Sequence, residues 1–134
     1  MYLMKKIDSE TYIKDLEEVF RILPKKDKST NVLDYDCIVC LKRSGFIIGA
    51  FLSNKGTCPL FTESEIESIP KNFNKILIVD DKIYSGKSIH KAVNKLFNLG
   101  KRTIETCAMY VEHQLQTKYY ILKTNGIVKM WYEN

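Results

Sequence analysis

The distribution of apolar and polar residues along the chain predicts a succession of strands and helices. Residues 75–80 contain four apolar residues in a row, which is typical of a strand buried on both faces in a parallel sheet. Residues 88–97 repeat apolar side chains at helical spacing, and Gly100 follows, a residue that suits the end of a helix. This stretch therefore predicts a strand, a short turn and a helix in direct succession.

The rest of the chain predicts the same kind of unit again. Residues 9–23 carry an apolar stripe at helical spacing, with Asp8 or Ser9 as the cap and Pro24 after the end. Further strands are expected at 36–41, 58–62, 103–111 and 127–132, a helical turn at 63–69, and a helix at 46–52. Alternating strands and helices predict an α/β fold, a doubly wound parallel sheet of about five strands with flanking helices.

The length and charge of the chain narrow the classes of function. A chain of 134 residues is expected to form a single domain, 1–134, with its core at about 34–112. The net charge of +5 is compatible with polyanionic small molecules, and no run of Lys and Arg is long enough to predict nucleic-acid binding. No apolar segment is long enough to span a membrane, and residues 1–6 lack the apolar core of a signal peptide. We therefore expect a cytoplasmic protein that binds neither nucleic acid nor membranes.

The four cysteines are expected to be reduced thiols in that compartment. Cys37 and Cys40 form a C-x-x-C pattern, but they fall on a predicted strand, where residues three apart face opposite sides. We therefore interpret them as small buried hydrophobic residues. With only His90 and His113 as further ligands of that kind, no zinc site is predicted.

Polar residues that can bind a ligand follow directly after the strand predicted at 75–80. Asp80 and Asp81 close the predicted strand, and a short turn leads to the helix. The backbone N–H groups of residues 85–88 are expected to converge at the positive end of the helix dipole, which suits a phosphate. Carboxylates at the mouth of such a site suit sugar hydroxyls or a metal ion. The predicted ligand is therefore a phosphorylated sugar.

A second turn at the same edge of the sheet is basic. Residues 42–45 follow another predicted strand and offer the side chains of Lys42 and Arg43, the Ser44 hydroxyl and backbone donors beside Gly45. Ligands of parallel α/β sheets bind at the carboxyl ends of the strands. This turn therefore suits a second anion, although a solvent-facing basic turn would have the same composition.

Two partial resemblances do not extend far enough. Gly86, Lys87 and Ser88 resemble the end of a P-loop, but that motif needs a Gly where this chain has Asp81. The apolar strand and its aspartates also resemble the opening strand of a receiver domain. Too little chain follows Asp81 to complete that fold.

Residues 76–88 as a whole resemble the signature of type I phosphoribosyltransferases: an apolar strand, two acidic residues, three variable residues, then Thr/Ser-Gly-x-Thr/Ser. The resemblance implies that Asp80 and Asp81 hold the ribose hydroxyls of 5-phosphoribosyl 1-pyrophosphate (PRPP), directly or through Mg²⁺. It implies a loop around the 5′-phosphate and a loop at the pyrophosphate. The first consists of Ser85, Gly86, Lys87 and Ser88, and the second of Lys42, Arg43, Ser44 and Gly45.

The activity implied by this resemblance is a pentosyl transfer in the cytoplasm. A nucleobase, with purines slightly favoured, or a related acceptor would displace pyrophosphate from PRPP with the help of Mg²⁺. Residues 9–23 and 113–134 could form a hood, in which Trp131 would stack on the base. The resemblance also implies that the protein can form homodimers.

Three departures from the family pattern concern the acceptor. Tyr84, which we group with Asp80 and Asp81 as the catalytic set, stands where 6-oxopurine enzymes carry an acid. Glu112 or His113 stands where those enzymes carry a Lys, so Glu112 is taken as an acceptor-binding residue. Only about a dozen residues separate 62 from 75, where most members carry a long mobile loop. A non-catalytic regulatory protein that binds PRPP or nucleotides therefore remains the alternative.

Overall fold

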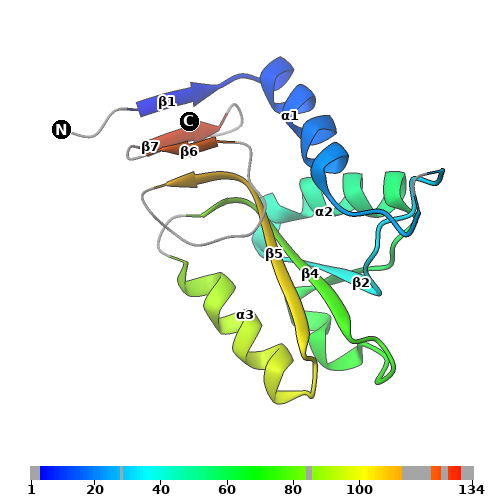
Figure 1. The fold of residues 1–134 in the computed structure, drawn as a ribbon. Helices are drawn as coiled ribbons and strands as arrows, with labels where there is room; N and C mark the ends of the chain where they lie inside the picture. The colour runs from blue at the N-terminus through cyan, green and yellow to red at the C-terminus, as the bar shows by residue number, and fades with distance from the viewer. Residues whose placement is uncertain (1–3, 28, 84–85, 113–121, 125–126, 131–134) are drawn as a thin grey trace.

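The computed structural model describes residues 4–27, 29–83, 86–112, 122–124 and 127–130 (Figure 1). Within these residues, five parallel strands form one sheet in the order β3-β2-β4-β5-β6. The strands are β2 (Cys37–Cys40), β3 (Leu60–Thr62), β4 (Lys75–Ile83), β5 (Thr103–Glu112) and β6 (Leu122–Thr124). The predicted α/β fold with a parallel sheet of about five strands is confirmed.

Helices cover both faces of the sheet (Figure 1). The helices α1 (Ser9–Ile22) and α2 (Lys42–Gly56) pack on one face, and α3 (Lys87–Asn98) packs on the other. A 3-10 helix, η1 (Glu63–Ser68), follows β3 and contacts α3. The predicted cap of α1 is confirmed, since Asp8 Oδ1 accepts the N–H of Thr11 at 2.7 Å.

The core has two layers, one on each face of the sheet. Leu77 and Val79 of β4 join the cluster beneath α1 and α2, whereas Ile76 and Ile78 join the cluster beneath α3. The same alternation separates two of the cysteines, as predicted: Cys40 lies in the first cluster and Cys37 in the second. All four cysteines are free and buried.

A second, two-stranded sheet joins the two ends of the chain. β1 (Met4–Ile7) pairs in parallel with β7 (Ile127–Met130). The strand expected at 127–132 is present as Ile127–Met130, but it lies in this second sheet and not in the main one, and the sequence predicted no strand at Met4–Ile7. The segment Met4–Ile7 is too short for its apolar and polar residues to show a strand pattern. It forms a strand by pairing with β7, which lies more than a hundred residues away.

Two element boundaries differ from the prediction, and both affect the site. Residues 42–45 form the first turn of α2 and not a separate turn, and Gly45 N donates to Leu41 O at 3.1 Å. The strand β4 continues three residues beyond Asp80, because β5 pairs along it, with Lys82 opposite Tyr110. The acidic pair therefore lies within the strand.

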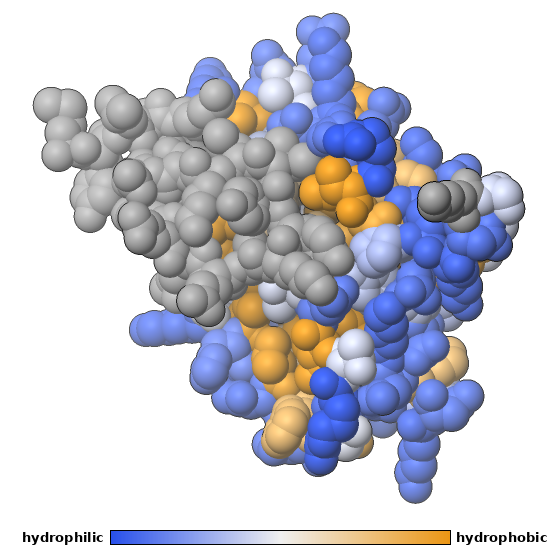
Figure 2. Space-filling model, viewed as in Figure 1, coloured by the Kyte–Doolittle hydropathy of each residue, from blue (hydrophilic) through white to orange (hydrophobic). Residues whose placement is uncertain are grey.

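Hydrophilic side chains cover most of the described surface on the face in Figure 2, with apolar areas near α1 and α2 and between α3 and β5. The large apolar side chains that are exposed include Phe46 and Ile47 of α2 and Phe97 near the end of α3. Among the described helices, none has the length and apolar content that a membrane crossing requires.

Candidate functional site

Two helices begin at the same edge of the sheet without a side-chain cap. β2 and β4 are parallel neighbours, α2 follows β2 directly, and α3 begins soon after β4. The N-cap residues are Leu41 for α2 and Gly86 for α3, and neither makes a side-chain capping bond. The first amides of each helix have no partner within the helix and carry its positive dipole end. This edge therefore has two places that suit an anion.

The acidic pair lies between these two helix starts. Asp80 and Asp81 are each only 2% exposed. Asp80 Oδ1 accepts the N–H of Asp81, and Asp81 Oδ1 accepts the N–H of Lys82, both at 2.8 Å. Asp81 Oδ2 is buried and has no hydrogen-bond partner in the described part of the chain. The expectation that both carboxylates lie at the mouth of the site is wrong, because neighbouring elements cover them.

An unpartnered buried carboxylate oxygen requires an explanation, because its desolvation opposes folding. A sugar hydroxyl or a cation at Asp81 Oδ2 would satisfy it. In the described residues, no group of three or more His, Cys, Asp or Glu side chains could hold a metal by itself. The pair fits Mg²⁺ only together with ligand oxygens, which is the usual mode for that ion.

The first turn of α2 packs directly against Asp80. A Cβ atom on Gly45 would lie 3.3 Å from Val79 O and 3.4 Å from Asp80 Oδ1, so a larger residue would be crowded. The absence of a side chain at Gly45 lets the helix start lie beside Asp80. The structure thus brings together the basic segment and the acidic pair, as the sequence predicts.

Two tyrosines on the α1 side were not predicted as part of the site. Burial and the negative charges of Asp81 and Asp80 raise the pKa of Tyr12 in α1. Burial also raises the pKa of Tyr110, whose hydroxyl donates to Asp15 Oδ2 at 2.7 Å. Both phenols therefore stay protonated. The sequence places Tyr12 in the apolar stripe of α1, and no local signal links it to residues so far along the chain.

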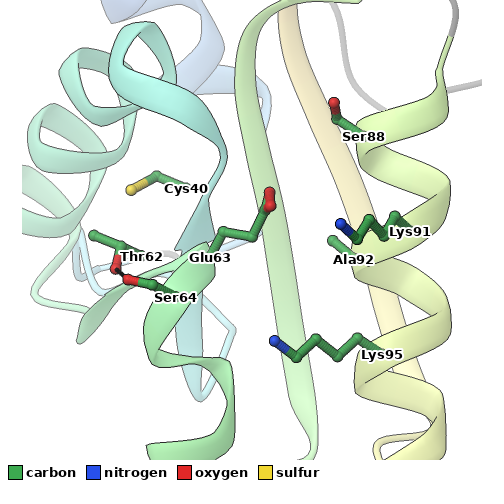
Figure 3. Close-up of a pocket in the computed structure, with 8 residues that line it drawn as sticks. All are labelled: Cys40, Thr62, Glu63, Ser64, Ser88, Lys91, Ala92 and Lys95. Carbon is green, nitrogen blue, oxygen red and sulfur yellow. Dashed lines mark hydrogen bonds between the residues drawn. The ribbon is translucent and has the colours of Figure 1, made fainter.

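A cavity of about 420 Å³ lies between α3 and η1 (Figure 3). Lys91 and Lys95 project into it from α3, and Glu63 projects from η1 (Figure 3). Its remaining lining residues are Cys40, Thr62, Ser64, Ser88 and Ala92. Among the predicted site residues that the structure describes, Ser88 alone lines this cavity.

The other predicted site residues divide into described and undescribed ones. Gly86 has a φ of 78°, a left-handed conformation that glycine adopts readily, and Lys87 begins α3. Arg43 is exposed on the first turn of α2. Glu112 ends β5 at the same edge as the other strands. Tyr84, Ser85 and Trp131 lie outside the described residues, as do the side chains of Lys42 and Glu112.

The fold and these groups define an α/β protein in which a buried acidic pair and two uncapped helix starts lie together at the carboxyl edge of the sheet. No family model and no curated protein matches the sequence. Solved structures match the fold. A xanthine-guanine-hypoxanthine phosphoribosyltransferase of Helicobacter pylori is similar with a TM-score of 0.78 and 16% identity, over 98% of this chain and 94% of that one.

Two further solved structures are also similar in fold to this chain. A purine phosphoribosyltransferase of Pyrococcus horikoshii has a TM-score of 0.75 at 16% identity, over 98% of this chain and 94% of that one. A protein of Neisseria gonorrhoeae with bound ppGpp has a TM-score of 0.71 at 13% identity, over 97% and 89%. The chain therefore has the type I phosphoribosyltransferase fold, which confirms the resemblance as far as fold.

Proposed function

We propose that the protein is a PRPP-dependent phosphoribosyltransferase, in which a nucleobase displaces pyrophosphate. One observation carries the proposal: two uncapped helix starts flank a buried acidic pair that has an unpartnered oxygen. PRPP has the matching groups, a phosphate at C5, a diphosphate at C1 and a diol between them. The similar structures of a xanthine-guanine-hypoxanthine phosphoribosyltransferase and a purine phosphoribosyltransferase support the choice of a purine.

The two helix starts would have different tasks. The amides at the start of α3, together with Ser85 and Ser88, would bind the 5′-phosphate. The free amides at residues 42–44, with the cationic side chains there, would bind the diphosphate. The amide of Gly45 donates to Leu41 O, so Gly45 would contribute by its small size alone.

The reaction would be a substitution at C1 of the ribose. The bond from C1 to the diphosphate oxygen breaks, positive charge develops on the ring, and a base nitrogen forms the new bond. Asp80 and Asp81 would hold the diol, and the start of α2 would stabilise the charge that the leaving diphosphate gains. Mg²⁺, when bound with the substrate, would neutralise part of that charge. Tyr84, Glu112 and Trp131 stay predicted for the acceptor side.

A second candidate is a regulatory protein that binds PRPP or nucleotides without transfer. The N. gonorrhoeae structure holds ppGpp, which shows that a protein of this fold can bind a guanine nucleotide. The short connection from Thr62 to Lys75, half of which is the η1 helix, also favours this candidate.

Pyrophosphate release separates the two candidates. With PRPP and Mg²⁺, we expect release that depends on one base from a panel of purines and pyrimidines. Asp80→Asn with Asp81→Asn should abolish release, and Glu10→Gln with Glu17→Gln, which removes two exposed carboxylates on α1, should preserve it. Binding of PRPP without release for any acceptor would favour the regulatory candidate.

A homodimer is part of the proposal. Phe46 and Ile47 of α2 are 50% and 40% exposed, and a second copy of the chain would cover them. Sedimentation velocity should show a dimer at micromolar concentration. A monomer at every concentration would contradict this part.

A further inference from the structure

The cavity between α3 and η1 continues the proposed phosphate site along one face of α3. Ser88, Lys91 and Lys95 follow one another at spacings of three and four residues, so they share that face, and all three line the cavity. Figure 3 shows Ser88 near the start of the helix and the two lysines further along. Both lysine side chains extend from α3 across the cavity (Figure 3).

The two lysines are available to an anion. Lys91 has no ion pair in the described residues, and Lys95 Nζ lies 3.6 Å from Glu67 Oε1. The side chains of Lys95 and Glu67 are 41% and 75% exposed, and an exposed pair of this kind contributes little to stability. An anion could replace Glu67 as the partner of Lys95 at low cost.

The remaining walls limit what kind of anion fits. Thr62 Oγ1 and Ser64 Oγ already bond each other at 3.0 Å, and burial raises the pKa of the Cys40 thiol, so the floor is neutral. Glu63 carries a carboxylate that faces the lysines across the cavity (Figure 3). A carboxylate beside phosphate oxygens is a typical setting for Mg²⁺. The lining therefore suits a diphosphate that carries Mg²⁺.

We propose that this cavity binds the second and later phosphates of a ribose 5′-diphosphate or 5′-triphosphate, so that nucleoside di- and triphosphates compete with PRPP for the ribose site. The proposal rests on the proposed function, because the ribose and the first phosphate occupy the site described above. A monophosphate ends at the start of α3. Lys95 lies seven residues beyond Ser88, about 10 Å along the helix axis. Only a longer phosphate chain can approach both lysines.

The test compares nucleotides that differ by one phosphate. Calorimetric titration in Mg²⁺ should show that GDP binds at least about tenfold more tightly than GMP, or ADP more tightly than AMP, because charge-assisted hydrogen bonds to phosphate are added. Lys91→Ala with Lys95→Ala should remove this preference and leave monophosphate affinity unchanged. Lys91→Arg with Lys95→Arg should retain it.

The matched control is Lys14→Ala with Lys71→Ala, which removes the same charge from two exposed positions outside the cavity. This control should keep the preference for diphosphates. An equal affinity of the wild-type protein for mono- and diphosphates, or a preference that survives Lys91→Ala with Lys95→Ala, would overturn the proposal.

A ligand without ribose separates this proposal from the proposed function. Magnesium tripolyphosphate should bind the wild-type protein and bind the Lys91→Ala, Lys95→Ala variant at least about tenfold more weakly. Binding of tripolyphosphate but of neither PRPP nor nucleotides would contradict the proposed function and also the competition at the ribose site. Binding of PRPP with no lysine-dependent gain from added phosphates would overturn this proposal alone.

Discussion

At the scale of single residues, Asp81 is the least expected feature of the structure. The sequence predicts it as a ligand-binding carboxylate, but its burial could not be predicted. Its negative charge acts on Tyr12 of α1, which belongs to a distant part of the chain. One of its oxygens receives the N–H of Lys82 and the other receives nothing in the described residues. Burial of a carboxylate oxygen without a hydrogen-bond partner opposes folding. Ligand binding at Asp81 would account for keeping such a residue.

Asp81→Asn should therefore raise stability while it removes ligand binding. The amide keeps the acceptor for Lys82 N–H and removes a buried charge. The expected gain is about 1 kcal/mol, or roughly 3 °C in Tm for a chain of this size. Scanning calorimetry measures the change in Tm. Glu17→Gln, at an exposed position on α1, is the control and should leave Tm unchanged. A lower Tm together with unchanged PRPP binding would contradict this view of Asp81.

At the scale of elements, local sequence patterns predicted the helices and strands whose signal lies within the element itself. The apolar run of β4 and the helical spacing of α3 are self-contained signals, and both elements are confirmed. Pairing over long distances produced the errors. The extension of β4 depends on β5, and β1 depends on β7. The start of α2 at Lys42 depends on the packing of Gly45 against β4.

Asp36 joins the starts of β2 and β4 and gives a pH-dependent prediction. Its Oδ2 accepts the N–H groups of Asn74 and Lys75 at 2.7 and 2.9 Å, and these bonds lower the pKa of Asp36. Because the folded-state pKa lies below the unfolded value of about 3.9, this contribution is complete at higher pH. It is lost as the pH falls through the folded-state pKa.

Asp36→Asn should therefore cost about 1 kcal/mol of unfolding free energy at pH 7, and the difference from wild type should shrink below about pH 4. Denaturant titrations at pH 7 and pH 3 measure it. Asp34→Asn, which loses an exposed pair with Lys75 at 2.8 Å, is the control and should cost less than about 0.5 kcal/mol. A cost for Asp36→Asn that is independent of pH would contradict this account.

At the scale of the whole molecule, the two core layers enclose all four thiols. Burial raises the pKa of Cys37 to about 12 and that of Cys58 to about 11, which leaves little thiolate at neutral pH. A thiol reagent at pH 8 should label none of the four cysteines in the native protein and all four after denaturation. Rapid labelling of one thiol without unfolding would show that a core layer is open.

The candidate site is formed by segments that are distant in the sequence, and the sequence predicts only part of it. Parallel strands bring their carboxyl ends to one edge, so the meeting of residues 42–45 with Asp80 could be anticipated. The cavity could not. Lys91 and Lys95 have the spacing of an ordinary exposed helix face, and Glu63 belongs to a segment that approaches them only in the folded chain.

The central claim is that Asp80, Asp81 and the start of α3 hold one ribose phosphate. Calorimetric titration of PRPP with Mg²⁺ tests it most directly, with wild type and folded Asp80→Asn, Asp81→Asn protein side by side. The expected result is saturable binding of one PRPP per chain to wild type and none to the variant. PRPP that fails to bind the wild-type protein, or that binds both proteins equally, would contradict the claim.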